Sequence, residues 1–498
     1  MNKQLRHISV VALILIAVLV VSTTYWQTWA VAGLADRQDN AVALVARLTV
    51  NRGKILGAGG TVLATNRKHR KHGLTIFTRR YPSGTLAPQV IGYATEAGTT
   101  TGLEQSLDDY LTGANTNLSN TFSEELDKLG GQTVKGDNVI LTLRPALQSL
   151  ALQQLAGRCG AVVALDARTG AILTMASSPT YDANLISKPG GFARIVKIKG
   201  SCGDSSALVN NATAGLYPPG STFKMVTAAA ALDSGAYTPS SVFQDPGYCI
   251  EYGQHVSNAG NPDQNGPEAF GSVTLAQGFE HSINSVFCKI GMHIGGEKIL
   301  EYAKRFGFYS LPPLDTPPNT SQASGLYKNG KLWTPKSESD IDSGRLAFGQ
   351  FNLLSTPLQM AMVGQTIANG GEEAQPYLVD RIVASDGSTV TKTTPHMLGR
   401  PIKAQTAAEL NQMMQLVVQG GTAATVGFPA GLDVAGKTGT AETGVPGVYD
   451  AWFVCFAPAS NPRYVVAVQV AKQLNGFGAS VSAPIAKAIL EKLMGSTG

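Results

Sequence analysis

The segment Tyr217-Pro218-Pro219-Gly220-Ser221-Thr222-Phe223-Lys224 joins a tight turn to an apolar helix. Two prolines and a glycine favour the turn. The run from Met225 to Leu232 that follows is apolar on nearly every face, and Gly235 stands where a helix C-cap is expected. Because such a helix has no polar face to turn toward water, the sequence predicts that it is buried in a large domain, with Ser221 in its first turn.

Ser221 and Lys224 have the spacing of a nucleophile and its base. Free backbone N–H groups and the helix dipole at the first turn favour a negative charge developing on Ser221. Lys224 lies one turn further on nearly the same face, so its amine can reach the Ser221 hydroxyl. Desolvation in an apolar helix favours the neutral amine. The pair is therefore predicted to be an activated serine beside a general base.

Two later segments have the residue types that complete such a site. Ser282-Ile283-Asn284 offers a hydroxyl and an amide on one short turn, and Lys437-Thr438-Gly439-Thr440 precedes an aromatic, β-rich run from Tyr449 to Ala457 that is typical of a hairpin. The patterns S-x-x-K, S-x-N and K-T-G, in this order, are the signature of penicillin-recognising serine acyltransferases. The sequence thus predicts three segments that meet at one site.

Composition limits the class of protein and the cofactors it needs. The chain has 498 residues, of which 43% are hydrophobic and 15% are charged, which is typical of an ordered protein of two or three domains. The net charge of +5 comes from dispersed residues, so nucleic-acid binding is not indicated. The 7 histidines form no ligand-spaced cluster, and we expect neither a metal nor an organic cofactor.

Residues 1–32 predict a membrane anchor. Lys3 and Arg6 precede the apolar run from Ile8 to Val21, and aromatic residues follow it, as in a single transmembrane helix with its basic end in the cytoplasm. Ala30-Val31-Ala32 also resembles a cleavage site, so a cleaved signal peptide is the alternative. In either case everything after residue 32 is expected outside the membrane.

A spacer domain is expected at residues 33–135. Leu48 to Ile55 and Leu74 to Thr78 are predicted strands, and a helical stretch begins at Gly102 and ends at Leu111. The basic run from Asn66 to His72 is predicted to be a solvated turn or edge, with an anionic partner or a metal site through His69 and His72 as alternatives.

Residues 136–498 are expected to form the catalytic domain. A helix is predicted from Pro145 to Gln154, a hairpin from Gly160 to Ser177, a last strand from Tyr464 to Lys472 and a closing helix from Ala483 to Met494. Strands at both ends of a helical middle predict an α/β sandwich with an antiparallel sheet flanked by helices.

With these motifs the chain resembles a class B penicillin-binding protein, of the short actinobacterial penicillin-binding protein A type. The resemblance extends over nearly the whole chain. The segments that carry it, besides the three motifs, are Gly160 to Asp166, Phe348-Gly349-Gln350, Thr356-Pro357-Leu358-Gln359, Ile367 to Gly371, Arg52-Gly53-Lys54-Ile55 and Gly102-Leu103-Glu104. Two departures are Gly57-Ala58-Gly59, where the family has acidic and basic residues, and Cys455, where it usually has glycine.

The resemblance implies a fold and an activity. The fold would be the penicillin-binding transpeptidase and β-lactamase-like α/β fold on a smaller, mainly β pedestal. The activity would be that of a peptidoglycan D,D-transpeptidase, inhibited by β-lactams, in which Ser221 attacks the D-Ala–D-Ala carbonyl of a stem peptide. No glycosyltransferase-sized segment precedes residue 136, so glycan strands would come from a separate glycosyltransferase.

Roles for the motif residues follow from the same resemblance. Lys224 would be the base, Ser282 a proton relay, and Asn284 a holder of Lys224 and of the substrate amide. Lys437 would lower the pKa of Lys224 and attract the substrate carboxylate. The carboxylate would be bound by Thr438 and Thr440, beside Gly439, and the backbone N–H groups of Ser221 and Thr440 would form the oxyanion hole.

Three alternatives share these motifs or this architecture. A β-lactamase needs a base for deacylation, and no Glu-x-x-Leu-Asn type segment lies between Asn284 and Lys437. A D,D-carboxypeptidase differs only in its acceptor and stays open. A non-catalytic scaffold of a wall-synthesis complex would not need three intact motifs.

Five cysteines are present in a chain expected outside the membrane, where disulfides form. Cys455, in the strand after K-T-G, is predicted to be buried and unpaired. The other four allow three pairings, among which the sequence does not choose. We prefer the neighbours along the chain, Cys159 with Cys202 and Cys249 with Cys288.

Overall fold

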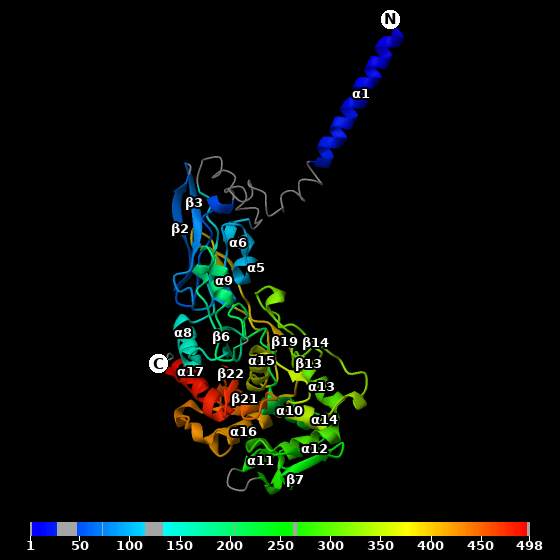
Figure 1. Ribbon diagram of the computed structural model, residues 1–498, viewed down its shortest axis with the longest axis vertical. Helices are drawn as coiled ribbons and strands as arrows, with labels where there is room; N and C mark the ends of the chain where they lie inside the picture. The colour runs from blue at the N-terminus through cyan, green and yellow to red at the C-terminus, as the bar shows by residue number, and fades with distance from the viewer. Residues whose placement is uncertain are drawn as a thin grey trace.

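The computed structural model describes residues 2–26, 47–71, 73–114, 133–203, 205–261 and 266–495. Figure 1 shows a long helix, α1 (Asn2–Tyr25), apart from an elongated body. The end of the body nearer α1 holds β2, β3 and the short helices α5 and α6, and the other end is mainly helical. The segment Arg6–Tyr25 is long and apolar enough to cross a membrane.

The catalytic domain contains a five-stranded antiparallel sheet, as the sequence predicts. The strand order is β20-β21-β22-β5-β6, so the two ends of the domain meet where β22 pairs with β5. The predicted hairpins and the last strand are confirmed. The bounds are β5 Gly160–Asp166, β6 Ile172–Ser178, β20 Ala435–Glu442, β21 Val448–Ala457 and β22 Tyr464–Leu474.

Helices flank this sheet. α8 (Pro145–Leu155) and α17 (Ala483–Gly495) contact each other and the sheet, and both predictions are confirmed. α15 (Pro357–Ala368) packs on β5, β21 and β22, and α16 (Ala404–Gln419) packs on β20. α10 (Lys224–Asp233) contacts α15, α16, α12 (Asn284–Ile294) and α13 (Gly296–Arg305). All residues of α10 are buried, as its apolar sequence predicts.

The second sheet has six strands in the order β18-β17-β4-β1-β2-β3. Its strands come from three separate parts of the chain, so the sheet extends across the expected boundary at residue 136. Their bounds are β1 Ile55–Leu56, β2 Val62–Lys71, β3 Leu74–Arg80, β4 Asn138–Leu141, β17 Val379–Val383 and β18 Thr389–Lys392. We call the domain around it the pedestal.

The predicted strand from Leu48 to Ile55 is wrong for most of its length. Residues 47–49 form a helical turn, Asn51 makes only an isolated bridge to Lys135, and the strand begins at Ile55. Only Ile55 and Leu56 have partners on both sides, in β2 and β4. Tertiary pairing therefore overrides the β propensity of the preceding residues.

Buried ion pairs hold the pedestal together. Glu104 in α5 (Gly102–Ser106) is fully buried and accepts from Arg52 Nε at 2.7 Å and from Arg79 Nε at 2.5 Å. Burial alone would raise the pKa of Glu104, but Arg79 and Arg52 outweigh it and lower the pKa. Arg52 also pairs with Asp108 in α6 (Asp108–Thr112). No local pattern in the sequence predicts these ion pairs.

Further helices and short strands lie between residues 242 and 347. Those used below are α11 Leu275–Glu280, α12 Asn284–Ile294, α13 Gly296–Arg305 and α14 Ser343–Ala347, with the short strands β7 Val242–Asp245, β8 Tyr248–Glu251, β9 Gln254–Ser257, β13 Gly325–Lys328 and β14 Lys331–Leu332.

Candidate active site

The turn that carries Ser221 is a short 3₁₀ helix, Gly220–Phe223, which leads into α10. Gly220 has φ +51°, a left-handed conformation that favours glycine, and its backbone N–H donates to Gly349 O at 3.2 Å. A Cβ on Gly349 would lie 2.0 Å from Gly220 O, so only glycine allows this approach. The turn is further held by Trp452 Nε1, which donates to Pro218 O at 2.9 Å. Ser221 is left half-buried at this position.

Lys224, the first residue of α10, is fully buried. Its Nζ donates to Ser282 O at 2.6 Å, to Asn284 Oδ1 at 2.8 Å and to Ser282 Oγ at 3.3 Å. The sequence predicted that this amine reaches Ser221. In the described part of the chain, however, no hydrogen bond joins the two side chains. The S-x-x-K and S-x-N motifs are therefore linked directly through the Lys224 amine.

Ser282 lies between two lysine amines. Lys437 Nζ donates to its Oγ at 2.9 Å, and Lys224 Nζ approaches the same oxygen. Ser282 has φ +58°, which is uncommon for a residue with a side chain and is often found at functional sites. One hydroxyl thus connects all three sequence motifs.

The two lysines are both buried beside each other and have depressed pKa values. Desolvation lowers the pKa of Lys224 well below its usual value, and the nearby charge of Lys437 lowers it further. Desolvation lowers the pKa of Lys437 to about 7. None of the ion pairs among the described residues includes either lysine. A neutral Lys224 is therefore accessible near neutral pH.

β20 lies at the edge of its sheet and beside the nucleophile turn. A Cβ on Gly439 would lie 2.8 Å from Thr222 Cγ2 and 3.0 Å from Pro219 O, so a side chain here would push the strand away. Thr438 Oγ1 lies 2.5 Å from Thr422 Oγ1, and Thr440 Oγ1 accepts from Gly478 N at 3.3 Å. An edge strand has unpaired backbone groups on one side, which suits the binding of an extended peptide.

Backbone contacts from a segment outside the three motifs hold the helix of the nucleophile. Thr227 Oγ1 in α10 donates to Ala347 O at 2.7 Å. The next residue, Phe348, has its ring 5.9 Å from Lys224 Nζ, and Gly349 contacts the nucleophile turn as described above. The sequence singled out Phe348-Gly349-Gln350 by resemblance alone, without assigning this role.

The start of α12 is fixed by a polar network that sequence reasoning missed. Asn284 Nδ2 donates to Ser257 O at 3.1 Å, and Ser285 N donates to Asn258 Oδ1 at 2.9 Å. Buried Asp245 accepts from Asn258 Nδ2 and from the Ser285 hydroxyl. The only sequence signal was the position of Ser285 directly after S-x-N. The network orients Asn284 toward Lys224.

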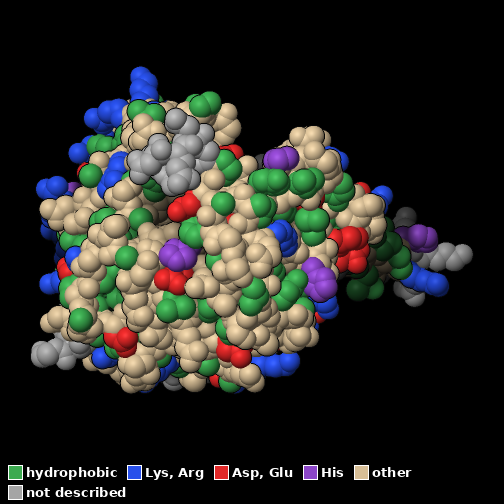
Figure 2. Space-filling view, turned by 90° about the horizontal axis from the view of Figure 1, so that it is seen from below, with side chains coloured by type: hydrophobic (Ala, Val, Ile, Leu, Met, Phe, Trp, Pro, Cys, Tyr) green, Lys and Arg blue, Asp and Glu red, His purple; other side chains and the backbone are tan. Residues whose placement is uncertain are grey.

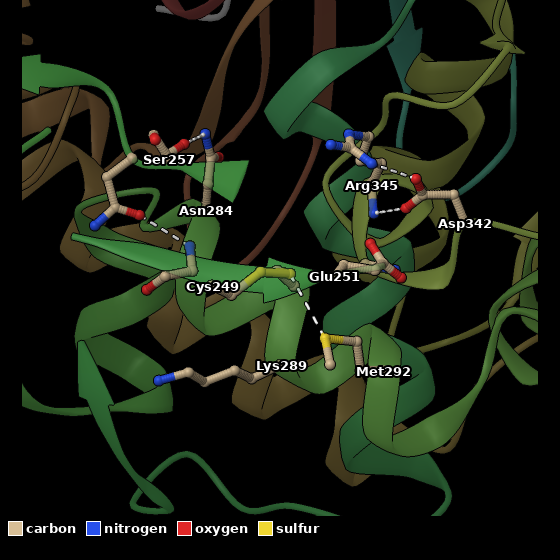
Figure 3. The surroundings of a disulfide bond; sticks show 12 residues. Cys249, Glu251, Ser257, Asn284, Lys289, Met292, Asp342 and Arg345 are labelled. Atoms are coloured by element: carbon tan, nitrogen blue, oxygen red, sulfur yellow. Dashed lines mark hydrogen bonds and ion pairs between the residues drawn. A yellow bond between two sulfur atoms is a disulfide. The ribbon is translucent and has the colours of Figure 1, made fainter. Parts of the chain in front are cut away.

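Both predicted disulfides are confirmed. Cys159 pairs with Cys202 and Cys249 with Cys288, with Cα–Cα distances of 5.9 Å and 6.4 Å. Figure 3 shows that the second bond joins β8 to α12, the helix that begins at Asn284. Cys455 is free and buried, as expected, and burial raises the pKa of its thiol.

Metal-binding side chains do not cluster in the described ranges, where no group of three His, Cys, Asp or Glu could hold an ion. The metal alternative named for the basic run involves His72, which lies outside these ranges. His69 Nε2 shares a hydrogen bond with Thr78 Oγ1 at 2.9 Å.

Two family models match the chain. The penicillin binding protein transpeptidase domain matches residues 160–491, and the penicillin binding protein A dimerisation domain matches residues 52–139. Peptidoglycan D,D-transpeptidase PbpA of Mycolicibacterium smegmatis is 34% identical over 505 residues, which cover 98% of each chain. The protein of the same name from Mycobacterium tuberculosis is 34% identical over 507 residues, 99% of each chain.

Solved structures are similar as well. The ceftriaxone acyl-enzyme complex of penicillin-binding protein A from M. tuberculosis matches with a TM-score of 0.79 and 30% identity, over 90% of this chain and 99% of that one. The imipenem acyl-enzyme complex of the same protein matches with a TM-score of 0.78 over 90% of this chain.

Proposed function

Since the chain belongs to the penicillin-binding protein transpeptidases and is a peptidoglycan D,D-transpeptidase, we propose that Ser221 is its nucleophile, acting with Lys224, Ser282, Asn284 and Lys437. The substrate is a stem peptide that ends in D-Ala–D-Ala, and β-lactams acylate the same serine. The rest of the proposal assigns each step to one of these groups.

Acylation begins with the neutral Lys224 amine, which removes the Ser221 proton while Oγ attacks the carbonyl of the penultimate D-Ala. The C–N bond to the terminal D-Ala then breaks, and the leaving amine takes a proton that passes from Lys224 through Ser282. The hydrogen bonds from both lysines to the Ser282 hydroxyl support this route. An amine from a second stem peptide attacks the ester, loses a proton along the same path, and releases Ser221.

The residues of β20 bind the substrate. Lys437 attracts the terminal carboxylate, Thr438 and Thr440 donate hydrogen bonds to it, and Gly439 keeps the strand close to the nucleophile turn. The backbone N–H groups of Ser221 and Thr440 form the oxyanion hole, with each donor worth about 3–4 kcal/mol of transition-state stabilisation.

The observation that carries this proposal is the Ser282 hydroxyl, which lies within hydrogen-bonding distance of both lysine amines. Intact-mass analysis after treatment with penicillin should find one adduct, on the peptide that contains Ser221. An adduct that persists in Ser221→Ala would refute the assignment. Turnover with and without an acceptor amine then separates cross-linking from release of the terminal D-Ala by water.

The setting in the cell is part of the proposal. Arg6–Tyr25 supports an uncleaved anchor in the cytoplasmic membrane, with Lys3 and Arg6 at the cytoplasmic end and the catalytic domain outside. The two matched family models describe a dimerisation and a transpeptidase domain. A separate glycosyltransferase would therefore supply the glycan strands that this enzyme cross-links. The pedestal, expected at residues 33–135, would hold the catalytic domain away from the membrane.

A further inference from the structure

The β2–β3 hairpin extends beyond the rest of the pedestal sheet. β1 pairs with β2 only at Val62 and Ala64, whereas β2 and β3 remain paired with each other out to Lys71 and Leu74. In the described part of the chain, the distal half of the hairpin therefore has no further strand on either side. The basic run singled out in the sequence lies here, and the transpeptidase reaction makes no use of it.

Unpaired cations cover the β2–β3 hairpin, which we call the arm. Arg67, Lys68, Arg70 and Arg80 are exposed, and none of them belongs to an ion pair among the described residues. Like charges so close together repel one another unless an anion screens them. Charged side chains also protect an edge strand from unwanted pairing, but these four cations lie together on one hairpin and leave a concentrated positive surface.

One face of the arm borders a groove of about 720 Å³. The pairing register places Arg80 beside Thr65 and Arg67 beside Thr78 on that face. No aspartate or glutamate is among the residues that line the groove, which are Thr65, Asn66, Arg67, His69, Thr78, Arg79, Arg80, Asn184, Ser187 and Lys188. The described residues that line the groove thus combine positive charge with neutral hydrogen-bonding groups.

Arg79 lies on the opposite face of the hairpin from Arg67 and Arg80, with its guanidinium toward Glu104 and Gly53. Its side chain is only 3% exposed and its Nε is committed to Glu104. Its Nη2 is buried without a hydrogen-bond partner in the parts of the chain that the structure describes. The guanidinium groups open to an anion in the groove are therefore those of Arg67 and Arg80, which are exposed. Guanidinium groups match the oxygens of phosphate, with which they form paired hydrogen bonds.

The location of the arm indicates the source of the phosphate. Figure 1 shows β2 and β3 at the end of the body nearer α1. Residues 47–80 are the first part of the described body after the anchor. Near the tip, Leu74 is 48% exposed between the basic strands. Exposed apolar side chains flanked by cations are typical of segments that rest on an anionic lipid surface.

We propose that the β2–β3 hairpin and its groove bind the phosphate groups of anionic phospholipids at the outer surface of the membrane that α1 crosses. The inference rests on the proposed anchoring of α1. Each cation contributes roughly a five-fold preference for an anionic over a neutral surface. The contact fixes the orientation of the pedestal, and therefore of the catalytic domain, relative to the membrane.

The test uses the full chain in lipid nanodiscs, with a polarity-sensitive fluorophore attached at Leu74→Cys. Emission should shift to the blue when phosphatidylglycerol is added to phosphatidylcholine, and the shift should disappear at high salt. Arg67→Gln/Arg80→Gln should abolish it. The control Lys331→Gln/Lys336→Gln removes the same charge from exposed positions of the catalytic domain and should preserve it. Penicillin acylation should be unchanged in all variants, which shows that they are folded.

Two other outcomes of the experiment would identify a different ligand. Inorganic phosphate is titrated into the protein in phosphatidylcholine nanodiscs. Saturable binding that Arg67→Gln/Arg80→Gln removes, without a lipid-dependent shift, would assign the groove to a soluble phosphate and overturn the lipid proposal. A label that stays polar in both lipids, with no phosphate binding, would also overturn it and leave the arm to an acidic protein partner.

Failure of the anchor gives a different result. A protein recovered free of phosphatidylcholine nanodiscs refutes the anchoring by α1. The hairpin is then scored by flotation with phosphatidylglycerol vesicles, where loss of binding in Arg67→Gln/Arg80→Gln but not in the lysine control supports the lipid contact. Equal binding of both variants overturns it.

Discussion

The pedestal and the catalytic domain each bury a cluster of charged side chains, and the two clusters are built in opposite ways. In the pedestal, Arg52 and Arg79 share the fully buried carboxylate of Glu104. In the catalytic domain, Lys224 and Lys437 are buried and have only neutral hydrogen-bond partners among the described residues. These are the hydroxyl and backbone carbonyl of Ser282, the Asn284 amide and the Thr438 carbonyl.

The difference shows that a counterion decides whether buried charged groups stabilise the fold or supply a reactive side chain. Opposite charges keep the pedestal groups ionised, with the pKa of Glu104 lowered by the two arginines against the effect of burial. Desolvation without a counterion lowers the pKa of both lysines, and the charge of Lys437 lowers the pKa of Lys224 further. A buried cluster with paired charges is unreactive and stabilises the fold, whereas buried lysines without a counterion supply a base.

The largest expected effect is on the reactive cluster. Lys224→Met keeps the length of the side chain and removes the amine. Acylation of Ser221 by labelled penicillin should then slow about 10³-fold or more, because the base is lost. The unfolding midpoint should not fall, since a desolvated amine leaves the core. A variant that reacts at the wild-type rate would show that Lys224 is not the base.

In the pedestal, Glu104→Gln should lower the stability of the protein without slowing acylation. It leaves two buried guanidinium groups without a counterion and should lower the free energy of unfolding by about 3–5 kcal/mol. Urea titration measures this, and the protein that remains folded should acylate normally. The folded pKa of Glu104 is lowered, so the wild-type contribution is present at neutral pH and is lost as pH falls through that value. Unchanged stability in the variant would mean that the cluster is not a structural brace.

The two disulfides brace only the catalytic domain, at sequence separations of 43 and 39 residues. Cys159→Ala/Cys202→Ala and Cys249→Ala/Cys288→Ala should each lower the free energy of unfolding by about 3–4 kcal/mol, from loop closure. Acylation of the folded protein should persist because no cysteine takes part in the chemistry. Inactivation of the folded enzyme by thiol alkylation alone would contradict this.

A smaller effect of opposite sign is expected at Lys437. Lys437→Met should raise the free energy of unfolding by about 1–2 kcal/mol, since a buried charge without a counterion is removed at a functional site. It should also slow acylation, and Lys437→Arg should slow it less because the charge stays. Equal loss of rate in both variants would show that the shape of the side chain, not its charge, is what the site needs.

The smallest effect is the pH dependence. The second-order acylation rate should rise as Lys224 loses its proton and fall above pH 7, because burial lowers the pKa of Lys437 to about 7 and its charge is needed for the β-lactam carboxylate. In Lys437→Arg the alkaline limb should vanish. An alkaline limb that survives there would have to come from another group.

The sequence could predict the catalytic cluster because each motif is local. The turn at Gly220 and the apolar helix after it place Ser221 and Lys224 one turn apart, and these features depend only on neighbouring residues. The hairpins of the large sheet could be predicted in the same way, whereas the pairing of the four cysteines was only a preference among three that the sequence leaves open. The Ser282 hydroxyl between two amines could be expected only by resemblance, since 155 residues separate it from Lys437.

The pedestal was less predictable because its contacts are not local. Arg79 and Glu104 are 25 residues apart, and no periodic pattern connects them. In the catalytic domain, the contact of Asp245 with α12 was not predictable for the same reason, because Asp245 and Ser285 are 40 residues apart. The strand expected from Leu48 failed for the same reason, since Ile55 and Leu56 are in register with β2 and β4 and the residues before them have no such neighbours.

The sheet shared between the domains has a consequence for inheritance. β4 and β17 pair through Val139 with Ile382 and Leu141 with Val379, although they are encoded far apart in the gene. A recombination event that exchanges residues 47–142 alone would replace four strands of the sheet and keep β17 and β18 from the old parent. Such a chimera has to match a new β4 to an old β17, so this pedestal should pass between lineages as two linked segments, or together with the whole enzyme.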